Sequence, residues 1–154
     1  MKKNLSLIFA TWFGIGLIPF APGTFGALLA LPLWYLLTLT YVEVQIAILV
    51  VGSLLLIPIC SIAGDALKEP DSSRIVVDEV AGMLISLIAV PFSLYNGLLA
   101  FVIFRLLDIA KPGPIGWLDK NLDGGLGVML DDILAGLFTC GIMHLVHTVW
   151  GAWL

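Results

Sequence analysis

The chain has 154 residues and a formal net charge of −4; 60% of its residues are hydrophobic and only 12% are charged. Soluble domains are about half apolar and about a quarter charged, so a water-soluble fold of this length could not bury so much apolar surface. The acidic balance excludes the basic surface that is typical of nucleic-acid binding, and we expect one integral membrane domain over residues 1–154.

The apolar segments predict an all-α bundle, polytopic in the membrane and containing some short or re-entrant helices. Leu5–Phe20 is short and interrupted by glycine and proline, so we expect a short, re-entrant or interfacial helix that leads into the loop 21–24. Phe25–Tyr41 and Val44–Gly64 each come close to the roughly 20 apolar residues that a span needs. The segment Asp132–Leu154 predicts a last span, with Asp131 at or near its N-cap.

The charged residues gather in two regions of the chain. Ten of the eleven acidic residues lie in 65–79 or 108–132, and five of the seven basic residues lie in or beside the same regions. Because Lys and Arg are retained on the cytoplasmic side of membranes, we expect both regions to form one acidic site on the cytoplasmic face. Carboxylates at the ends of apolar helices are costly unless they are paired, hydrated or bound to a cation.

The segment 80–104 decides whether the two charged regions can share a site. A single crossing of the membrane would put them on opposite sides. Proline and Asn-Gly occur within 91–97, in the middle of this segment, and these are turn residues. We therefore expect two helices, about 75–90 and 94–110, which form a hairpin and bring the charged regions to the same end of the bundle.

Two acidic pairs are followed in the same way by small residues. Asp78 with Glu79, and Asp131 with Asp132, each precede an Ala-Gly dipeptide by about one helical turn. Small residues let helices approach closely in membranes, and two acidic pairs brought together repel unless a divalent cation lies between them. Carboxylate oxygens without nearby histidine or cysteine suit Mg²⁺. The four carboxylates are therefore candidate Mg²⁺ ligands.

Basic residues and backbone amides near these pairs are candidates for phosphate binding. Arg105, Asp108 and Lys111 are spaced so that they share one face of a helix. We interpret Arg105 and Lys111 as cations for phosphate oxygens, and Asp108 as a further metal ligand or as the general base for an attacking water. Gly23 and Thr24 precede a predicted helix, where backbone N–H groups can bind an anion.

Two classes of function remain open on these residues. Intramembrane carboxylates could belong to a small ion transporter or proton-coupled transporter. The carboxylates here lie at helix ends instead of mid-helix, which favours a site that acts on a lipid headgroup. No motif for a covalent phosphoenzyme nucleophile is evident, so we expect direct attack by a metal-activated water.

Four blocks of sequence combine the small residues with these charged ones. In chain order they are Ala21-Pro22-Gly23-Thr24-Phe25-Gly26, Ile75-Val76-Val77-Asp78-Glu79-Val80-Ala81-Gly82, Phe104 to Ile115, and Gly124-Gly125-Leu126-Gly127 with Asp131-Asp132 and Ala135-Gly136. Together they resemble the phosphatidylglycerophosphatase A family, in the family's order and over most of the chain.

The resemblance implies a function for the whole chain. It implies a Mg²⁺-dependent enzyme of the bacterial inner membrane that hydrolyses phosphatidylglycerophosphate to phosphatidylglycerol and phosphate, a step of phospholipid biosynthesis. The substrate and the membrane lipids would be its partners. Glu79, Asp108 and Asp132 are our candidate catalytic residues in that reaction.

Overall fold

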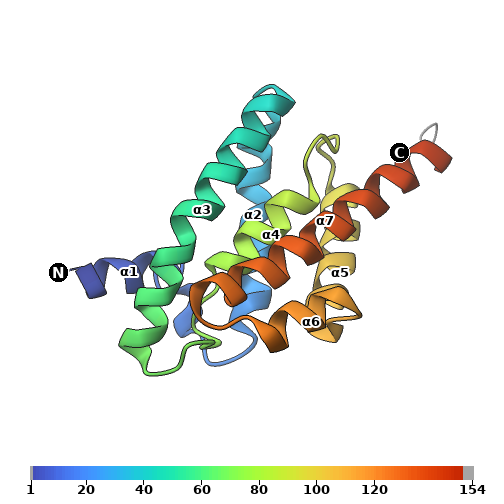
Figure 1. The fold of residues 1–154 in the computed structure, drawn as a ribbon. Coiled ribbons are helices and arrows are strands. Elements are labelled where there is room, and N and C mark those ends of the chain that lie inside the picture. Colours follow the sequence, from blue (N-terminus) through green and yellow to red (C-terminus); the bar gives the residue numbers. More distant parts are fainter. Residues whose placement is uncertain (1, 151–154) are drawn as a thin grey trace.

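A computed structural model describes the chain from residue 2 to residue 150, and the regular elements within these bounds are all helical (Figure 1). In chain order they are α1 (Lys2–Ala10), the 3-10 turn η1 (Ile15–Leu17), α2 (Pro22–Thr38), α3 (Val42–Leu67), α4 (Val77–Ser86), α5 (Leu94–Ala110), α6 (Pro114–Asn121) and α7 (Gly124–Trp150). The prediction of an all-α fold is therefore confirmed for this part of the chain.

Two of the helices, α3 and α7, are long and apolar enough to cross a membrane. The mean hydropathy of their most apolar windows is 2.7 and 1.7, and only 22% of the window in α3 is buried inside the bundle. A helix this apolar and this exposed supports association with a membrane. How many of the other helices cross the bilayer stays a prediction.

The helix α1 is short, as predicted, but it ends at Ala10 and does not cover the predicted range 5–20, because Trp12 and Phe13 take left-handed backbone conformations. Nine residues make a helix of about 14 Å, which is less than half of the roughly 30 Å hydrocarbon core of a bilayer. Figure 1 shows α1 lying across α3 instead of running along it. The η1 turn then leads to Pro22 at the start of α2.

The helices α4 and α5 form the predicted hairpin. The bounds of α5 coincide with the predicted range 94–110, whereas α4 is shorter than the predicted range 75–90. It ends at Ser86, and three residues further on Ala89 takes a left-handed backbone conformation with φ 57°, through which an α-helix cannot continue. The amide of Ala89 donates a hydrogen bond of 3.3 Å to the side-chain oxygen of Gln45 in α3, which fixes this connection to the bundle.

The start of α7 differs from the prediction. The sequence predicts a last span over 132–154, but the helix begins at Gly124, about two turns before Asp132. The extra turns are stabilised by packing against α3, where the amide of Gly125 donates a hydrogen bond of 3.0 Å to the hydroxyl of Ser61. Residues 151–154 of the predicted span lie outside the part of the chain that is described.

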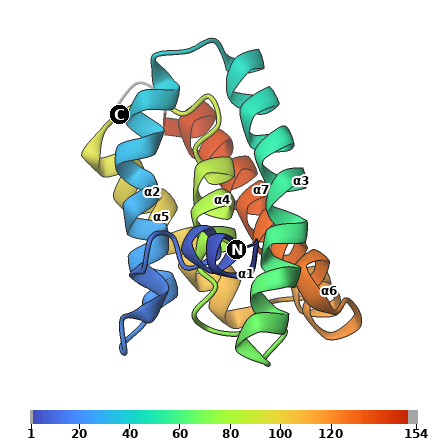
Figure 2. The ribbon, with the colours of Figure 1, turned by 90° about the vertical axis from the view of Figure 1, so that its left-hand side faces the viewer.

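Both charged regions lie at the same end of the bundle. Figures 1 and 2 show that the start of α2, the connection between α3 and α4, and the connections around α6 meet there. The connection between α2 and α3 lies at the opposite end. The convergence that the hairpin was expected to produce is therefore present in the structure.

The helices α4 and α7 cross in direct backbone contact at two glycines. A Cβ atom on Gly136 would collide with the carbonyl oxygen of Gly82, and a Cβ atom on Gly82 would lie 2.6 Å from the carbonyl oxygen of Asp132. The ring of Phe104 in α5 covers the same glycine. Because the two glycines lie one turn after Asp78 and Asp132, the crossing sets these carboxylates side by side.

We expect Gly136→Ala to destabilise the bundle, because the added methyl group has no room between α4 and α7. Overpacking of this kind costs about 1–3 kcal/mol, which thermal unfolding of the detergent-solubilised protein, followed by circular dichroism, would show as a lower midpoint. Gly141→Ala is the matched control in the same helix, since a Cβ there meets no atom within 4 Å. Alanine at that site should stabilise the helix by about 1 kcal/mol, and equal behaviour of the two variants would contradict the close crossing.

Candidate functional site

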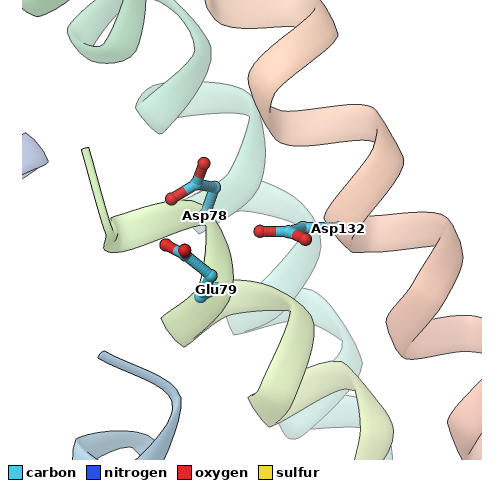
Figure 3. A group of neighbouring side chains, drawn as sticks. All are labelled: Asp78, Glu79 and Asp132. Atoms are coloured by element: carbon cyan, nitrogen blue, oxygen red, sulfur yellow. The ribbon is translucent and has the colours of Figure 1, made fainter. Parts of the chain in front are cut away.

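Three carboxylates from two helices meet where α4 crosses α7. Figure 3 shows Asp78 and Glu79, from the first turn of α4, beside Asp132 of α7. One oxygen from each of the three side chains lies within 4.8 Å of the other two. Asp78 and Asp132 are only 7% and 3% exposed. We call these three residues the carboxylate group.

The carboxylate group is poorly satisfied by the protein itself. Oδ1 of Asp78 and Oε2 of Glu79 are buried and have no hydrogen-bond partner among the described residues. Burial, followed by the charges of the neighbouring carboxylates, raises the pKa of Asp78 well above its usual value, and burial raises the pKa of Glu79 to about 7. Buried carboxylates this close together favour a cation between them.

The spacing of the carboxylate group fits one divalent cation. Mg²⁺ holds its oxygen ligands at about 2.1 Å, so two of its ligands lie at most about 4.2 Å apart. The three oxygens need to move by only a fraction of an ångström to meet this limit. Hard carboxylate oxygens with unpaired acceptors are the donor set that Mg²⁺ prefers. Asp78, Glu79 and Asp132 could therefore hold it.

The predicted phosphate-binding residue Arg105 borders the carboxylate group. Its Nη1 atom lies 3.8 Å from Oε1 of Glu79 and donates a hydrogen bond to Oδ2 of Asp108, one turn further along α5. Asp108 is close enough for its charge to act on both Glu79 and Asp132. The structure thus brings Arg105 and Asp108 to the site, while their chemical roles stay predictions.

The first turn of α2 also reaches the site. A Cβ atom on Gly23 would collide with Oε1 of Glu79 and would lie 3.3 Å from Nη1 of Arg105. Only glycine leaves room for these side chains. Thr24 follows in the same turn, and its amide is bonded to the carbonyl of Ala21 at 3.0 Å. Gly23 is therefore a wall of the site, and substrate binding by Gly23 and Thr24 stays a prediction.

Lys111 and Asp131 form a separate ionic contact beside the carboxylate group. Nζ of Lys111 donates to Oδ2 of Asp131 at 2.6 Å and also to Asp119 of α6. Asp131 is buried, but it is not among the three residues whose oxygens converge. Its predicted role as a metal ligand is not tested by this geometry, which shows it as a partner of Lys111.

Asp119 is a site residue that the sequence analysis did not single out. It lies in the charged region 108–132, on α6, a helix that the sequence analysis did not predict. The useful signal was the spacing of eight residues between Lys111 and Asp119 across Pro112-Gly113-Pro114, which is enough for a tight turn and two turns of helix.

Known proteins resemble this chain over almost its whole length. Residues 8–147 match the family model described as Phosphatidylglycerophosphatase A. A Phosphatidylglycerophosphatase A of Escherichia coli (strain K12) is 40% identical over 144 residues, which cover 93% of this chain and 84% of that relative. Another from Haemophilus influenzae is 38% identical, covering 94% of this chain and 93% of the relative.

A further relative carries a different name. A Putative phosphatidylinositol-3-phosphatase of Bacteroides thetaiotaomicron is 36% identical over 157 residues, which cover 96% of this chain and 96% of that relative. No solved structure matches this chain.

We expect a divalent cation to stabilise the detergent-solubilised protein, because it would neutralise the carboxylate group. A cation at 100 times its Kd stabilises a protein by about 2.7 kcal/mol, which is measured as a rise in unfolding temperature when Mg²⁺ or Mn²⁺ replaces EDTA. Asp78→Asn should lose this rise and should unfold in EDTA at the wild-type temperature or above. Asp65→Asn, which changes an exposed carboxylate of α3, is the control and should respond like wild type. A wild-type protein indifferent to both ions would contradict the site.

Proposed function

The chain belongs to the phosphatidylglycerophosphatase A family, and we propose that it hydrolyses the terminal phosphate monoester of phosphatidylglycerophosphate in a Mg²⁺-dependent reaction. Membership makes the chain a phosphatase. The observation that carries the Mg²⁺-dependent mechanism is the buried carboxylate group with Arg105 at its edge. A transporter is not supported by any relative.

In this mechanism Asp78, Glu79 and Asp132 would hold the metal ion. When bound, Mg²⁺ supplies a Lewis acid that polarises a phosphoryl oxygen and offsets its developing charge. The close contact of Gly82 with Gly136 sets α4 against α7 and would fix the positions of these ligands. The burial of Asp78 and Asp132 limits the access of bulk water to these two carboxylates.

Arg105 would orient the phosphate group. Its guanidinium has five N–H donors in a fixed plane, and the contacts with Asp108 and Glu79 engage only the Nη1 end. The Nε atom of Arg105 is buried and has no hydrogen-bond partner among the described residues. A phosphate oxygen would satisfy this donor. The N–H of Gly23, in the first turn of α2, is a second donor at the positive end of a helix.

Asp108 would act as the general base that takes a proton from the attacking water. A base must lie within hydrogen-bond reach of the water and be held in orientation. The hydrogen bond from Arg105 orients the Asp108 carboxylate, and its neighbours Glu79 and Asp132 belong to the carboxylate group. The products would be phosphatidylglycerol and inorganic phosphate, so the reaction would complete a step of phospholipid biosynthesis.

We place the enzyme in the bacterial inner membrane with the site facing the cytoplasm. Two candidate spans and the many exposed apolar side chains support the membrane. The concentration of basic residues at the same end as the site supports the cytoplasmic orientation.

The first experiment measures phosphate release from phosphatidylglycerophosphate in detergent micelles, with Mg²⁺ or with EDTA. We expect release with Mg²⁺ only, and its loss in Asp132→Asn, because the carboxylate group then lacks one ligand. Glu43→Gln, at the opposite end of α3, should keep wild-type activity. Phosphatidylinositol 3-phosphate forms a parallel arm, since the name of the Bacteroides relative points to it. Faster release from that lipid would overturn the proposed substrate.

A second experiment separates the two roles considered for Asp108. If Asp108 is the general base, Asp108→Asn should lower kcat by about 10²–10⁴-fold and leave the cation-dependent rise in unfolding temperature intact. If Asp108 is a metal ligand, the same substitution should weaken that rise as well. Measuring both quantities on the same preparation decides between the roles, and an unchanged kcat would remove Asp108 from the mechanism.

A further inference from the structure

The short helix α6 is built around Lys111. A Cβ atom on Gly116 would collide with the carbonyl oxygen of Lys111, so the backbone of α6 is packed directly against the end of α5. Three residues later, the carboxylate of Asp119 accepts a hydrogen bond from Nζ of the same lysine. The side chain of Ile115 is 1% exposed and anchors the helix in the core. One eight-residue element therefore contacts both the backbone and the side chain of Lys111.

Two carboxylates hold Lys111, but they do not use all of its hydrogen-bond donors. Its ammonium has three N–H donors, of which Asp119 and Asp131 take two. The lysine side chain remains 29% exposed, so the residue is not sealed off from solvent. A cavity of about 230 Å³ is lined in part by Asp119 and Asp131, the two partners of Lys111.

The position of Lys111 relates this contact to the site. Lys111 lies one turn beyond Asp108 at the end of α5, and its partner Asp131 precedes Asp132 of the carboxylate group. A lysine stem has four rotatable methylene groups, and holding it in one orientation costs side-chain entropy. Two carboxylates on two different helices impose that orientation before the substrate arrives.

We propose that Asp119 is a positioning residue that acts through Lys111 to orient a phosphate group of the lipid substrate. Asp119 does not itself touch the phosphate; with Asp131 it directs the third N–H of Lys111 toward it. The inference rests on the proposed phosphatase function, and it assigns to α6 a specific part in substrate binding.

The test is Asp119→Asn, which keeps the size of the side chain and removes the charge that holds Lys111. Because Lys111 would contact the phosphate in both the bound substrate and the transition state, its misorientation should raise KM with little change in kcat. We expect KM for phosphatidylglycerophosphate to rise about tenfold, equivalent to about 1.4 kcal/mol, and kcat to stay within about twofold of wild type. Asp119→Glu, which restores the charge, should recover most of the KM.

Asp123→Asn is the matched control. Asp123 is an exposed carboxylate that lines the same cavity, and it forms no ion pair with Lys111 in the described part of the chain. The control removes the same charge from the same region, so its KM should stay at the wild-type value. If Asp123→Asn and Asp119→Asn raised KM equally, a general effect of surface charge would replace the proposal.

Other outcomes also contradict the proposal. A lower kcat and a lower unfolding temperature at unchanged KM would show that Asp119 only stabilises the fold. A lower KM would show that Asp119 competes with the phosphate for Lys111.

A binding measurement separates this inference from the proposed function. Inorganic phosphate with Mg²⁺ should raise the unfolding temperature of the wild-type protein, and the rise should be smaller in Asp119→Asn than in Asp123→Asn. If wild type binds phosphate in this way but releases none from phosphatidylglycerophosphate, the proposed substrate fails and the role of Asp119 in phosphate binding stands. If Asp119→Asn binds phosphate like wild type, the role of Asp119 fails whatever the substrate.

Discussion

The site depends on one contact, the crossing of α4 and α7 at Gly82 and Gly136. Buried carboxylates repel one another, and no attraction between Asp78 and Asp132 would hold their helices together. Backbone packing does so instead, because two residues without side chains let the helices touch. The ring of Phe104 then covers the crossing from α5. The electrostatic strain at the carboxylates is thus offset by packing one turn away from them.

The charges around this crossing support the proposal that a cation binds there. Six carboxylates lie in the carboxylate group or in the ion pairs beside it, against the two cations Arg105 and Lys111. Each cation is already shared by two carboxylates. A phosphate group is itself an anion, so it would be repelled by the protein alone. A divalent ion bound among these carboxylates would offset part of their charge where the proposed phosphate would bind.

Much of this arrangement could be read from the sequence because it depends on local signals. The turn residues in 91–97 determined the hairpin, and the small residues after each acidic pair indicated the close crossing. The sequence analysis grouped Asp131 and Asp132 as equivalent ligands, although side chains of neighbouring helix residues point about 100° apart. In the structure Asp131 contacts Lys111, and Asp132 lies in the carboxylate group. The helix α6 was missed because eight residues carry too little periodicity to distinguish a helix from a loop, and its contact with Lys111 is tertiary.

The separation of the carboxylate group along the chain has a consequence for the order in which the enzyme is assembled during synthesis. Asp78 and Glu79 emerge from the ribosome well before Asp132, which lies on the last described helix. Until α7 docks, the first turn of α4 lacks both its packing partner and the third carboxylate. Docking of α7 and completion of the carboxylate group are then the same event, and a chain interrupted before α7 would leave Asp78 and Glu79 without Asp132. Such a chain would be readily distinguished from a finished one by the proteases that survey unassembled proteins.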